Sequence, residues 1–234
     1  MTKLFYIPGA CSFGPHMALR EASIPFSLQR VSFVDERSGE PIAVLNRAAR
    51  EKGYRAVYGD NRPFREISRK ALVPALLRDD GMLLTEGSAI YQFIAQAAPR
   101  KSLAPPEGSR EYYVFLSWLS EIASRVHKAI HVISHYGLSG DIREQWKAGL
   151  IECLDRAADL IRRTGYILGE FSLVDLYAFM NWHVAVDVVI GDFSRWLDIA
   201  DYFDRISARP AVSEAIVTEG TQARYFRSIV GVGR

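Results

Sequence analysis

The hydrophobic pattern of this chain changes on either side of a stretch rich in proline and polar residues, 99–108. Before that stretch, short β-prone runs alternate with short helical segments. After it every strong period is helical, and one apolar stripe with spacings of three and four extends for about five turns, from Tyr112 to Ile130. This order predicts a mixed α/β domain over residues 1–98 and an all-helical domain over residues 107–234.

The first thirty residues predict a strand, a helix and a second strand. A β-prone run covers residues 3–7. Ser12 is a favourable N-cap and Pro15 is tolerated in a first helical turn, so a helix is expected to include residues 16–22. A looser alternation marks a strand over 26–33. We expect the two strands to be parallel neighbours joined by a right-handed crossover.

A hairpin and a helix are predicted at the end of the first domain. Short apolar runs at 74–77 and 82–84 flank an Asp-Gly turn, which is the strongest short-range hairpin signal. The helix expected over 86–98 presents one apolar face and ends at Pro99. Residues 35–70 predict no element, and their part from 41 to 70 carries eight Lys and Arg against three acids. Such a charge run is most simply solvated surface.

Composition and cysteine usage exclude several classes of protein. Hydrophobic residues make up 49% and charged residues 24% of the 234 residues, which is typical of a globular chain with a sizeable core. The two cysteines, Cys11 and Cys153, form no CxxC motif. Neither a disulfide framework nor a cysteine-based metal site is therefore predicted, and a reducing compartment is favoured.

Charge and hydropathy favour a soluble cytoplasmic protein. The net charge of +2 is too small to argue for nucleic-acid binding. No apolar run approaches the ~20 residues that cross a bilayer, and the first residues lack the hydrophobic segment of a signal peptide. We expect no membrane and no nucleic-acid partner.

Six short motifs occur in order along the chain: YIPGACS at 6–12, VPAL at 73–76, LTEGSAI at 84–90, IASRVHK at 122–128, FSLVD at 171–175 and RPAV at 209–212. Taken together, they resemble those of the cytosolic glutathione transferases, most closely the bacterial beta class. The resemblance covers the whole chain except residues 35–70. It implies a thioredoxin-like N-terminal domain, an all-α C-terminal domain, a homodimer, and glutathione as co-substrate without a metal.

Val73 and Pro74 match the backbone element that holds glutathione in this family. The resemblance implies a cis peptide between them, so that the Val73 N–H and C=O can pair with the cysteinyl unit of glutathione. Without the resemblance, trans would be expected, because only about 5–6% of X-Pro bonds are cis.

Glu86, Gly87 and Ser88 open the helix expected over 86–98, where free N–H groups and the helix dipole favour an anion. The resemblance implies that Glu86 faces the ammonium of the γ-glutamyl group, while Gly87 and Ser88 receive its carboxylate. A purely structural interpretation is also open, with Thr85 as N-cap and Glu86 as a favourable acid in the first turn.

Cys11 and Ser12 are the candidates for contact with the thiolate. A thiol at a helix N-terminus has a depressed pKa, and the same field would stabilise the glutathione thiolate. Cys11 matches the beta-class cysteine, which can form a mixed disulfide with glutathione. Cys153, inside an amphipathic helix, is interpreted as an inert core residue. Tyr6 is ranked below Cys11 and Ser12, because it most simply packs on its strand.

His127 is expected on the cleft wall by resemblance, and Lys128 follows it as a glutathione-binding residue. A histidine there can donate to the sulfur or act as acid or base near pH 7. His131 and His135 continue the spacing of four. Three histidines at this spacing extend over ~12 Å of helix, too far to converge on one metal ion, so a polar stripe is the better account.

The chain departs from the family pattern at three positions that bear on activity. Leu72 stands where many relatives have glutamine, and Ser120 and Arg125 replace the Asn and the acid that precede the cleft histidine in the beta class. The insert over 35–70 leaves three alternatives open. It could extend a wall of the cleft, recruit a larger acidic co-substrate, or form solvated surface.

Two further residues are assigned to folding rather than to the site. Ser172 and Asp175 have the spacing of a capping box at the start of a helix. Tyr177, in the same helix, is most simply core.

The leading functional hypothesis is an enzyme that conjugates the glutathione thiolate to small, apolar electrophiles, as in detoxification. A second hypothesis is a glutathione-dependent thiol-disulfide reductase or peroxidase that acts through Cys11. A third is a glutathione- or ligand-binding protein without turnover, which Leu72, Ser120 and Arg125 leave open. Substituting Cys11 with Ala should abolish only the disulfide route.

Overall fold

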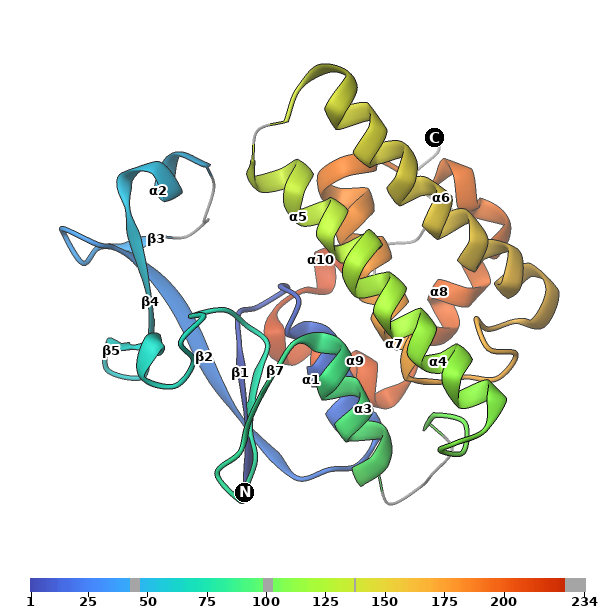
Figure 1. Cartoon of the computed structure of the whole chain (residues 1–234), viewed down its shortest axis with the longest axis horizontal. Helices are drawn as coiled ribbons and strands as arrows, with labels where there is room; N and C mark the ends of the chain where they lie inside the picture. Colours follow the sequence, from blue (N-terminus) through green and yellow to red (C-terminus); the bar gives the residue numbers. More distant parts are fainter. Residues whose placement is uncertain (43–46, 99–102, 137, 226–234) are drawn as a thin grey trace.

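The computed structural model describes residues 1–42, 47–98, 103–136 and 138–225. A mixed sheet forms the N-terminal part (Figure 1). Its strands are β1 (Thr2–Tyr6), β2 (Phe26–Asp35), β3 (Pro41–Ile42), β4 (Tyr54–Tyr58), β5 (Arg62–Pro63), β6 (Ala75–Leu77) and β7 (Leu83–Thr85). The order is β5-β4-β2-β1-β6-β7, and β3 also pairs with β2. Only β1 and β2 are parallel among these pairs.

The strand–helix–strand opening and the hairpin are confirmed. Helix α1 (Phe13–Glu21) connects β1 to its parallel neighbour β2. Strands β6 and β7 pair antiparallel around the Asp-Gly turn, and α3 (Gly87–Ala97) follows. Helix α1 contributes one side of the main core, and seven of its nine residues are buried, from Phe13 to Leu19.

Residues 35–70 are not merely solvated surface, and that expectation is wrong. Strand β2 continues to Asp35, and its second half pairs with β4 instead of β1. Helix α2 (Arg47–Lys52) precedes β4, and the short helix η1 (Phe64–Glu66) follows β5. A second apolar cluster fixes this extension to the sheet. It consists of Phe5, Val31, Ala56, Tyr58, Phe64 and Ala75.

The rest of the chain is helical, as predicted. The apolar stripe found in the sequence lies on one continuous helical segment, Arg110–His135, which contains a π-helical stretch at its centre. The helices are α4 (Arg110–Glu121), η3 (Ile122–His127), α5 (Lys128–His135), α6 (Gly140–Thr164), α7 (Leu173–Ala185), η4 (Val186–Ile190), η5 (Ser194–Ile199), α8 (Ala200–Ser207), α9 (Pro210–Glu219) and α10 (Gln222–Tyr225).

Helix α7 is the central helix of the core. With η4 it forms an 18-residue window, Leu173–Ile190, that is long and apolar enough to cross a membrane, yet 78% of that window is buried inside the protein. Burial on this scale is what a core helix of a globular protein shows. The N-terminus of α7 carries the predicted capping box of Ser172 and Asp175, which is confirmed.

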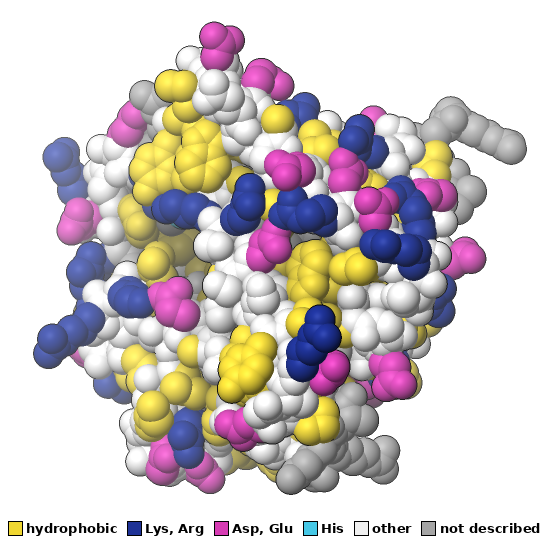
Figure 2. Space-filling view, turned by 45° about the vertical axis from the view of Figure 1, so that its right-hand side comes forward, with side chains coloured by type: hydrophobic (Ala, Val, Ile, Leu, Met, Phe, Trp, Pro, Cys, Tyr) yellow, Lys and Arg dark blue, Asp and Glu magenta, His cyan; other side chains and the backbone are white. Residues whose placement is uncertain are grey.

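Charges of both signs are interspersed on the face drawn in Figure 2, where Lys and Arg alternate with Asp and Glu. Part of the predicted linker, residues 99–102, and the end of the second predicted domain, residues 226–234, lie outside the described residues.

Candidate active site

A small pocket of about 160 Å³ lies between the end of the β-rich part and the helical segment Arg110–His135. It contains six of the nine residues that the sequence singled out. Ser12, Ser88 and Lys128 do not line it. Its lining is Cys11, Lys70, Leu72, Val73, Pro74, Thr85, Glu86, Gly87, Ala123, His127 and Tyr177.

Cys11 sits on the loop between β1 and α1, and the C-terminal helices hold that loop. Gly9 adopts a φ of 67°, donates its N–H to Glu219 Oε2 at 2.9 Å, and accepts from Arg224 Nη1 at 2.8 Å. Glu219 is itself fixed by His16, whose Nδ1 lies 2.7 Å from Oε1. The position of the thiol therefore depends on residues more than 200 positions away in the sequence.

The Cys11 thiol is not activated in this structure, contrary to the sequence-based expectation. Its side chain is half-buried, and its Sγ–H donates to the Val73 carbonyl oxygen at 3.0 Å. Burial raises the pKa of the thiol to about 12, although the N–H groups of Cys11 and Ser12 lower it. The helix N-terminus acts in the predicted direction, but desolvation is the larger effect.

Ser12 is also placed differently from its prediction. It stands at the N-cap of α1, but its side chain makes no capping bond. Its hydroxyl accepts the Ile7 N–H at 3.1 Å and donates to the Ile7 carbonyl at 3.2 Å, and the residue is fully buried. Because both hydrogen bonds stay within the loop, Ser12 shapes the turn that carries Cys11 and does not reach the pocket.

The Val73–Pro74 peptide is cis, as the resemblance implied. It brings the Val73 carbonyl and Leu72 to the pocket wall. The Leu72 side chain is 55% exposed, and it cannot form the hydrogen bond that a glutamine at this position could make.

Glu86 is the N-cap of α3, and Thr85 belongs to β7, so the alternative with Thr85 as cap is wrong. The Glu86 backbone has a φ of 70°, which is unusual for a residue other than glycine and common at binding sites. Its carboxylate is exposed and forms an ion pair with Lys70. Gly87 lies beside the Tyr177 hydroxyl, which would stand 3.0 Å from a Cβ at that position.

His127 ends η3 and enters the pocket from the opposite wall. Its Nδ1 lies 3.2 Å from Asn181 Oδ1, and the Asn181 amide donates to the Tyr177 carbonyl at 2.9 Å. Because the amide nitrogen is used in that bond, Oδ1 must accept, so the proton of the neutral imidazole is on Nδ1. Burial lowers the pKa of His127, and Nε2 is left as an unprotonated acceptor.

His131 and His135 do not converge with His127. The rings of His131 and His135 meet edge to face at 4.5 Å, and burial lowers the pKa of both. Across the described residues, no group of three His, Cys, Asp or Glu side chains could hold a metal ion.

Three residues of the site were missed in the sequence. Lys70 belongs to the basic segment, Tyr177 was assigned to the core, and Asn181 was not considered. Tyr177 and Asn181 carried a signal, because polar atoms in an otherwise apolar helix require partners. Nothing in the sequence distinguished Lys70 from its basic neighbours.

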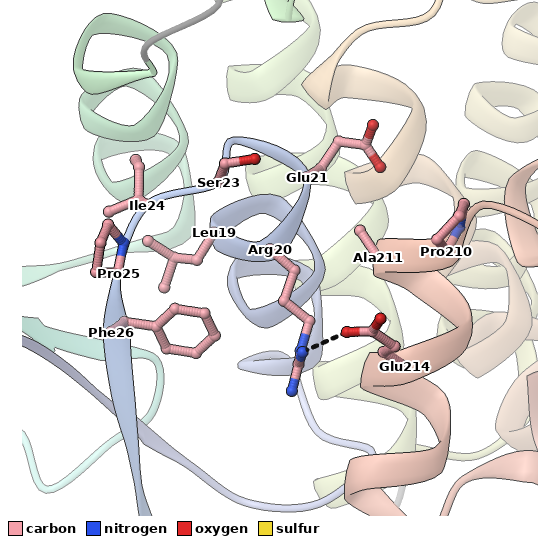
Figure 3. Close-up of a pocket in the computed structure, with 10 residues that line it drawn as sticks. All are labelled: Leu19, Arg20, Glu21, Ser23, Ile24, Pro25, Phe26, Pro210, Ala211 and Glu214. Carbon is pink, nitrogen blue, oxygen red and sulfur yellow. Dashed lines mark hydrogen bonds and ion pairs between the residues drawn. The ribbon is translucent and has the colours of Figure 1, made fainter.

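A larger hollow of about 610 Å³ lies away from this pocket, between the end of α1, the start of β2 and α9 (Figure 3). Arg20 reaches across it and pairs with Glu214, while Glu21 pairs with Arg209. Its charged side chains satisfy one another, and it contains none of the predicted site residues.

No family model matches the chain. A curated relative does match: Glutathione S-transferase GstA of Escherichia coli O157:H7 is 31% identical over 221 residues, which are 93% of this chain and 98% of the relative. The chain belongs to the glutathione S-transferase family.

Solved transferases share the fold. A bacterial beta class glutathione S-transferase of Sphingomonas chungbukensis is 32% identical with a TM-score of 0.74, and the match covers 93% of this chain and 98% of that one. A sphingomonad glutathione S-transferase, solved in complex with glutathione, is 31% identical with a TM-score of 0.70 and covers 94% and 99%. The resemblance to the transferases and to their beta class is thus confirmed, together with the fold and the transferase activity it implied.

Proposed function

We propose that this glutathione S-transferase joins the glutathione thiolate to small electrophiles in the pocket between Val73 and His127. One observation carries the proposal: the cis Val73–Pro74 backbone, the start of α3 and an acceptor nitrogen of His127 line a single pocket. The glutathione-bound relative supports glutathione as the co-substrate.

The tripeptide is placed by its charges. The cysteinyl backbone of glutathione pairs with the Val73 N–H and C=O. Its γ-glutamyl ammonium replaces Lys70 as the ion-pair partner of Glu86. Its α-carboxylate accepts hydrogen bonds from the N–H groups of Gly87 and Ser88. Lys70 and Lys128 add positive charge for a ligand with two carboxylates.

His127 Nε2 is the base in this proposal. It accepts the proton of the glutathione thiol, and Asn181 supports the resulting imidazolium through Nδ1. When the cysteinyl N–H of glutathione donates to the Val73 carbonyl oxygen in place of the Cys11 thiol, that thiol is free to donate to the glutathione sulfur. Ser12 is assigned a positioning role, since it holds the loop. The disulfide route through Cys11 is not favoured, because burial raises the pKa of that thiol to about 12.

We expect the oligomeric state and the cellular compartment to be those typical of the family. We place the domains at 1–98 and 107–234, and we expect a homodimer in the cytoplasm without a membrane or nucleic-acid partner. Light scattering on the purified chain measures the oligomeric state directly.

Calorimetry with glutathione, followed by a conjugation assay with an activated aromatic halide, tests the proposal. Glu86→Gln should weaken glutathione binding roughly ten- to a hundredfold, because a charge-assisted bond is lost. Glu66→Gln is the matched control, since Glu66 is an exposed carboxylate paired with Arg62 outside the pocket. Unchanged affinity in Glu86→Gln would contradict the placement, and the absence of any heat of binding would contradict the function.

A further inference from the structure

Tyr177 reaches the pocket from the first half of α7, and its neighbours fix its position. The residue is only 4% exposed, and the centre of its ring lies 4.7 Å from that of the Tyr91 ring. One turn later on α7, the Asn181 amide donates to the Tyr177 carbonyl oxygen at 2.9 Å. Tyr177 lines the same pocket as Glu86 and Gly87. Its hydroxyl therefore has a defined place at the wall of the site.

The Tyr177 hydroxyl lies beside the start of α3 and has no partner there. A Cβ on Gly87 would stand 3.0 Å from this oxygen. Among the described residues, no group forms a hydrogen bond with the hydroxyl. Burial raises the pKa of Tyr177, so the phenol keeps its proton and can donate at pH 7. A buried donor left in this state is costly unless a ligand completes it.

The start of α3 offers further donors at the same place. The first N–H groups of a helix have no partner inside the helix. Glu86, the N-cap, makes no side-chain capping bond and pairs instead with Lys70. The N–H groups of Gly87 and Ser88 can therefore bind an anion, which the helix dipole also favours. The Tyr177 hydroxyl beside Gly87 adds an independent donor to this end of the helix.

The γ-glutamyl group of glutathione carries an ammonium and a carboxylate on the same carbon, so these two charges must bind side by side. Glu86 lines the pocket, and in the proposed function it binds the ammonium. The carboxylate then lies close to Glu86, where it needs donors to offset the repulsion between two acids. A neutral phenol meets this need, because it donates to the carboxylate without competing with the ammonium for Glu86 as a cation would.

We propose that Tyr177 binds glutathione: its hydroxyl donates a hydrogen bond to the α-carboxylate of the γ-glutamyl group, beside the N–H groups of Gly87 and Ser88. The proposal rests on the proposed function and adds a specificity-determining residue to it. The hydroxyl favours thiol peptides with a free α-carboxylate over those that lack this group. Because it contacts the end of the ligand away from the sulfur, Tyr177 contributes to binding and not to the chemical step.

Calorimetry on Tyr177→Phe tests the proposal with three ligands: glutathione, S-methylglutathione, and the analogue in which 4-aminobutyrate replaces the γ-glutamyl residue. That analogue keeps the ammonium and lacks the α-carboxylate, whereas S-methylglutathione has no thiol. Tyr177→Phe should weaken the binding of glutathione and of S-methylglutathione roughly ten- to a hundredfold, because a hydrogen bond to a charged group is lost. It should leave the affinity for the 4-aminobutyryl analogue unchanged.

Tyr91→Phe is the matched control. It removes a buried hydroxyl from the ring that packs on Tyr177, and Tyr91 does not line the pocket. This variant should bind all three ligands as the wild type does. Thermal unfolding shows whether each variant is folded, and Tyr177→Phe should not lower the Tm of the free protein, because its hydroxyl has no partner to lose. The same glutathione concentration should raise the Tm of the wild type more than that of Tyr177→Phe.

Conjugation kinetics with an aromatic halide separate binding from chemistry. Tyr177→Phe should raise the KM for glutathione and leave kcat at saturating glutathione unchanged. Unchanged affinity for glutathione, a loss with glutathione but not with S-methylglutathione, or an equal loss with all three ligands would overturn the proposal. If Tyr177→Phe binds and conjugates glutathione as well as the wild type, the proposed function survives and only the role of Tyr177 fails. A wild type that binds no glutathione contradicts the proposed function itself.

Discussion

The Cys11 thiol and the Val73 carbonyl oxygen are joined by a hydrogen bond of 3.0 Å across the floor of the pocket. The bond uses the carbonyl that is expected to receive the backbone of glutathione. It also keeps the proton on Cys11, in accord with the pKa of about 12 that burial produces. The cysteine of this site is thus a hydrogen-bond donor rather than a thiolate.

Alkylation of Cys11 should accordingly be slow. With a pKa of about 12 against an ordinary 9.0, its thiolate fraction at pH 7 is about a thousandfold below that of an ordinary cysteine. The rate with iodoacetamide, followed by mass spectrometry, should rise about tenfold per pH unit up to pH 10. A plateau near pH 7 would show instead that the thiol is activated.

Cys11→Ala should retain conjugation, and thiol-disulfide exchange should be slow in both the wild type and the variant, because burial raises the pKa of the Cys11 thiol to about 12. Removal of one neutral donor to the sulfur costs about 0.5–1.5 kcal/mol, so kcat should fall by no more than about tenfold. The comparison uses an aromatic halide in one assay and a mixed glutathione disulfide in the other. A complete loss of conjugation in Cys11→Ala would contradict the role of His127 as the base.

Asn181→Asp should move the acidic limb of kcat/KM to higher pH. Burial lowers the pKa of His127, so the free base is present above that pKa and is lost as the pH falls through it. A carboxylate in place of the amide favours the imidazolium and should raise this pKa by about 1–3 units. The pH profile and an NMR titration of His127 measure the shift. Asn181→Ala, which adds no charge, should not move the limb upward.

Gly87→Ala should weaken both the fold and glutathione binding through Tyr177. The added Cβ would stand 3.0 Å from the Tyr177 hydroxyl, and the nearest ring carbon would be 3.4 Å away. Relief of this crowding requires a shift in the core or in the start of α3, with an expected loss of about 1 kcal/mol. Tyr177→Phe removes the oxygen, so the double variant should recover most of the loss in urea unfolding. Simple additivity of the two changes would exclude this contact as the cause.

Ser172→Ala should reduce stability by about 0.5–2 kcal/mol, because its side chain caps α7. Ser139→Ala is the control: Ser139 is the N-cap of α6 but makes no side-chain capping bond, so its loss should be nearly neutral. Urea unfolding measures both variants, and activity per folded molecule should not change in either. Equal effects of the two substitutions would show that the capping bonds are not the cause.

The order of the elements could be predicted because local patterns govern it. The Asp-Gly turn specified the β6–β7 hairpin, and the apolar spacing specified the helical segment that ends at His135. The segment 35–70 could not be predicted in this way. Its short strands are stable only because β4 pairs with the second half of β2 and Phe64 packs on the same cluster.

The residue types of the site were visible in the sequence, but their states were not. Cys11 stands at a helix N-terminus, which predicts a low pKa, yet the atoms packed around it reverse the direction. The role of Ser12 differs from the predicted one for a similar reason, because its hydroxyl forms both of its hydrogen bonds with Ile7.

By itself the amino-acid sequence determined the family, the helical and β-rich parts, and six of the residues that line the pocket, because periodicity, turn chemistry and short motifs are properties of neighbouring residues. Only the tertiary structure decided which proton each group holds and which groups face one another. The burial of Cys11 and the Asn181 contact of His127 both involve segments that are distant in the sequence. Their electrostatic effects depend on distance in space and on exclusion of water, which the order of residues does not specify.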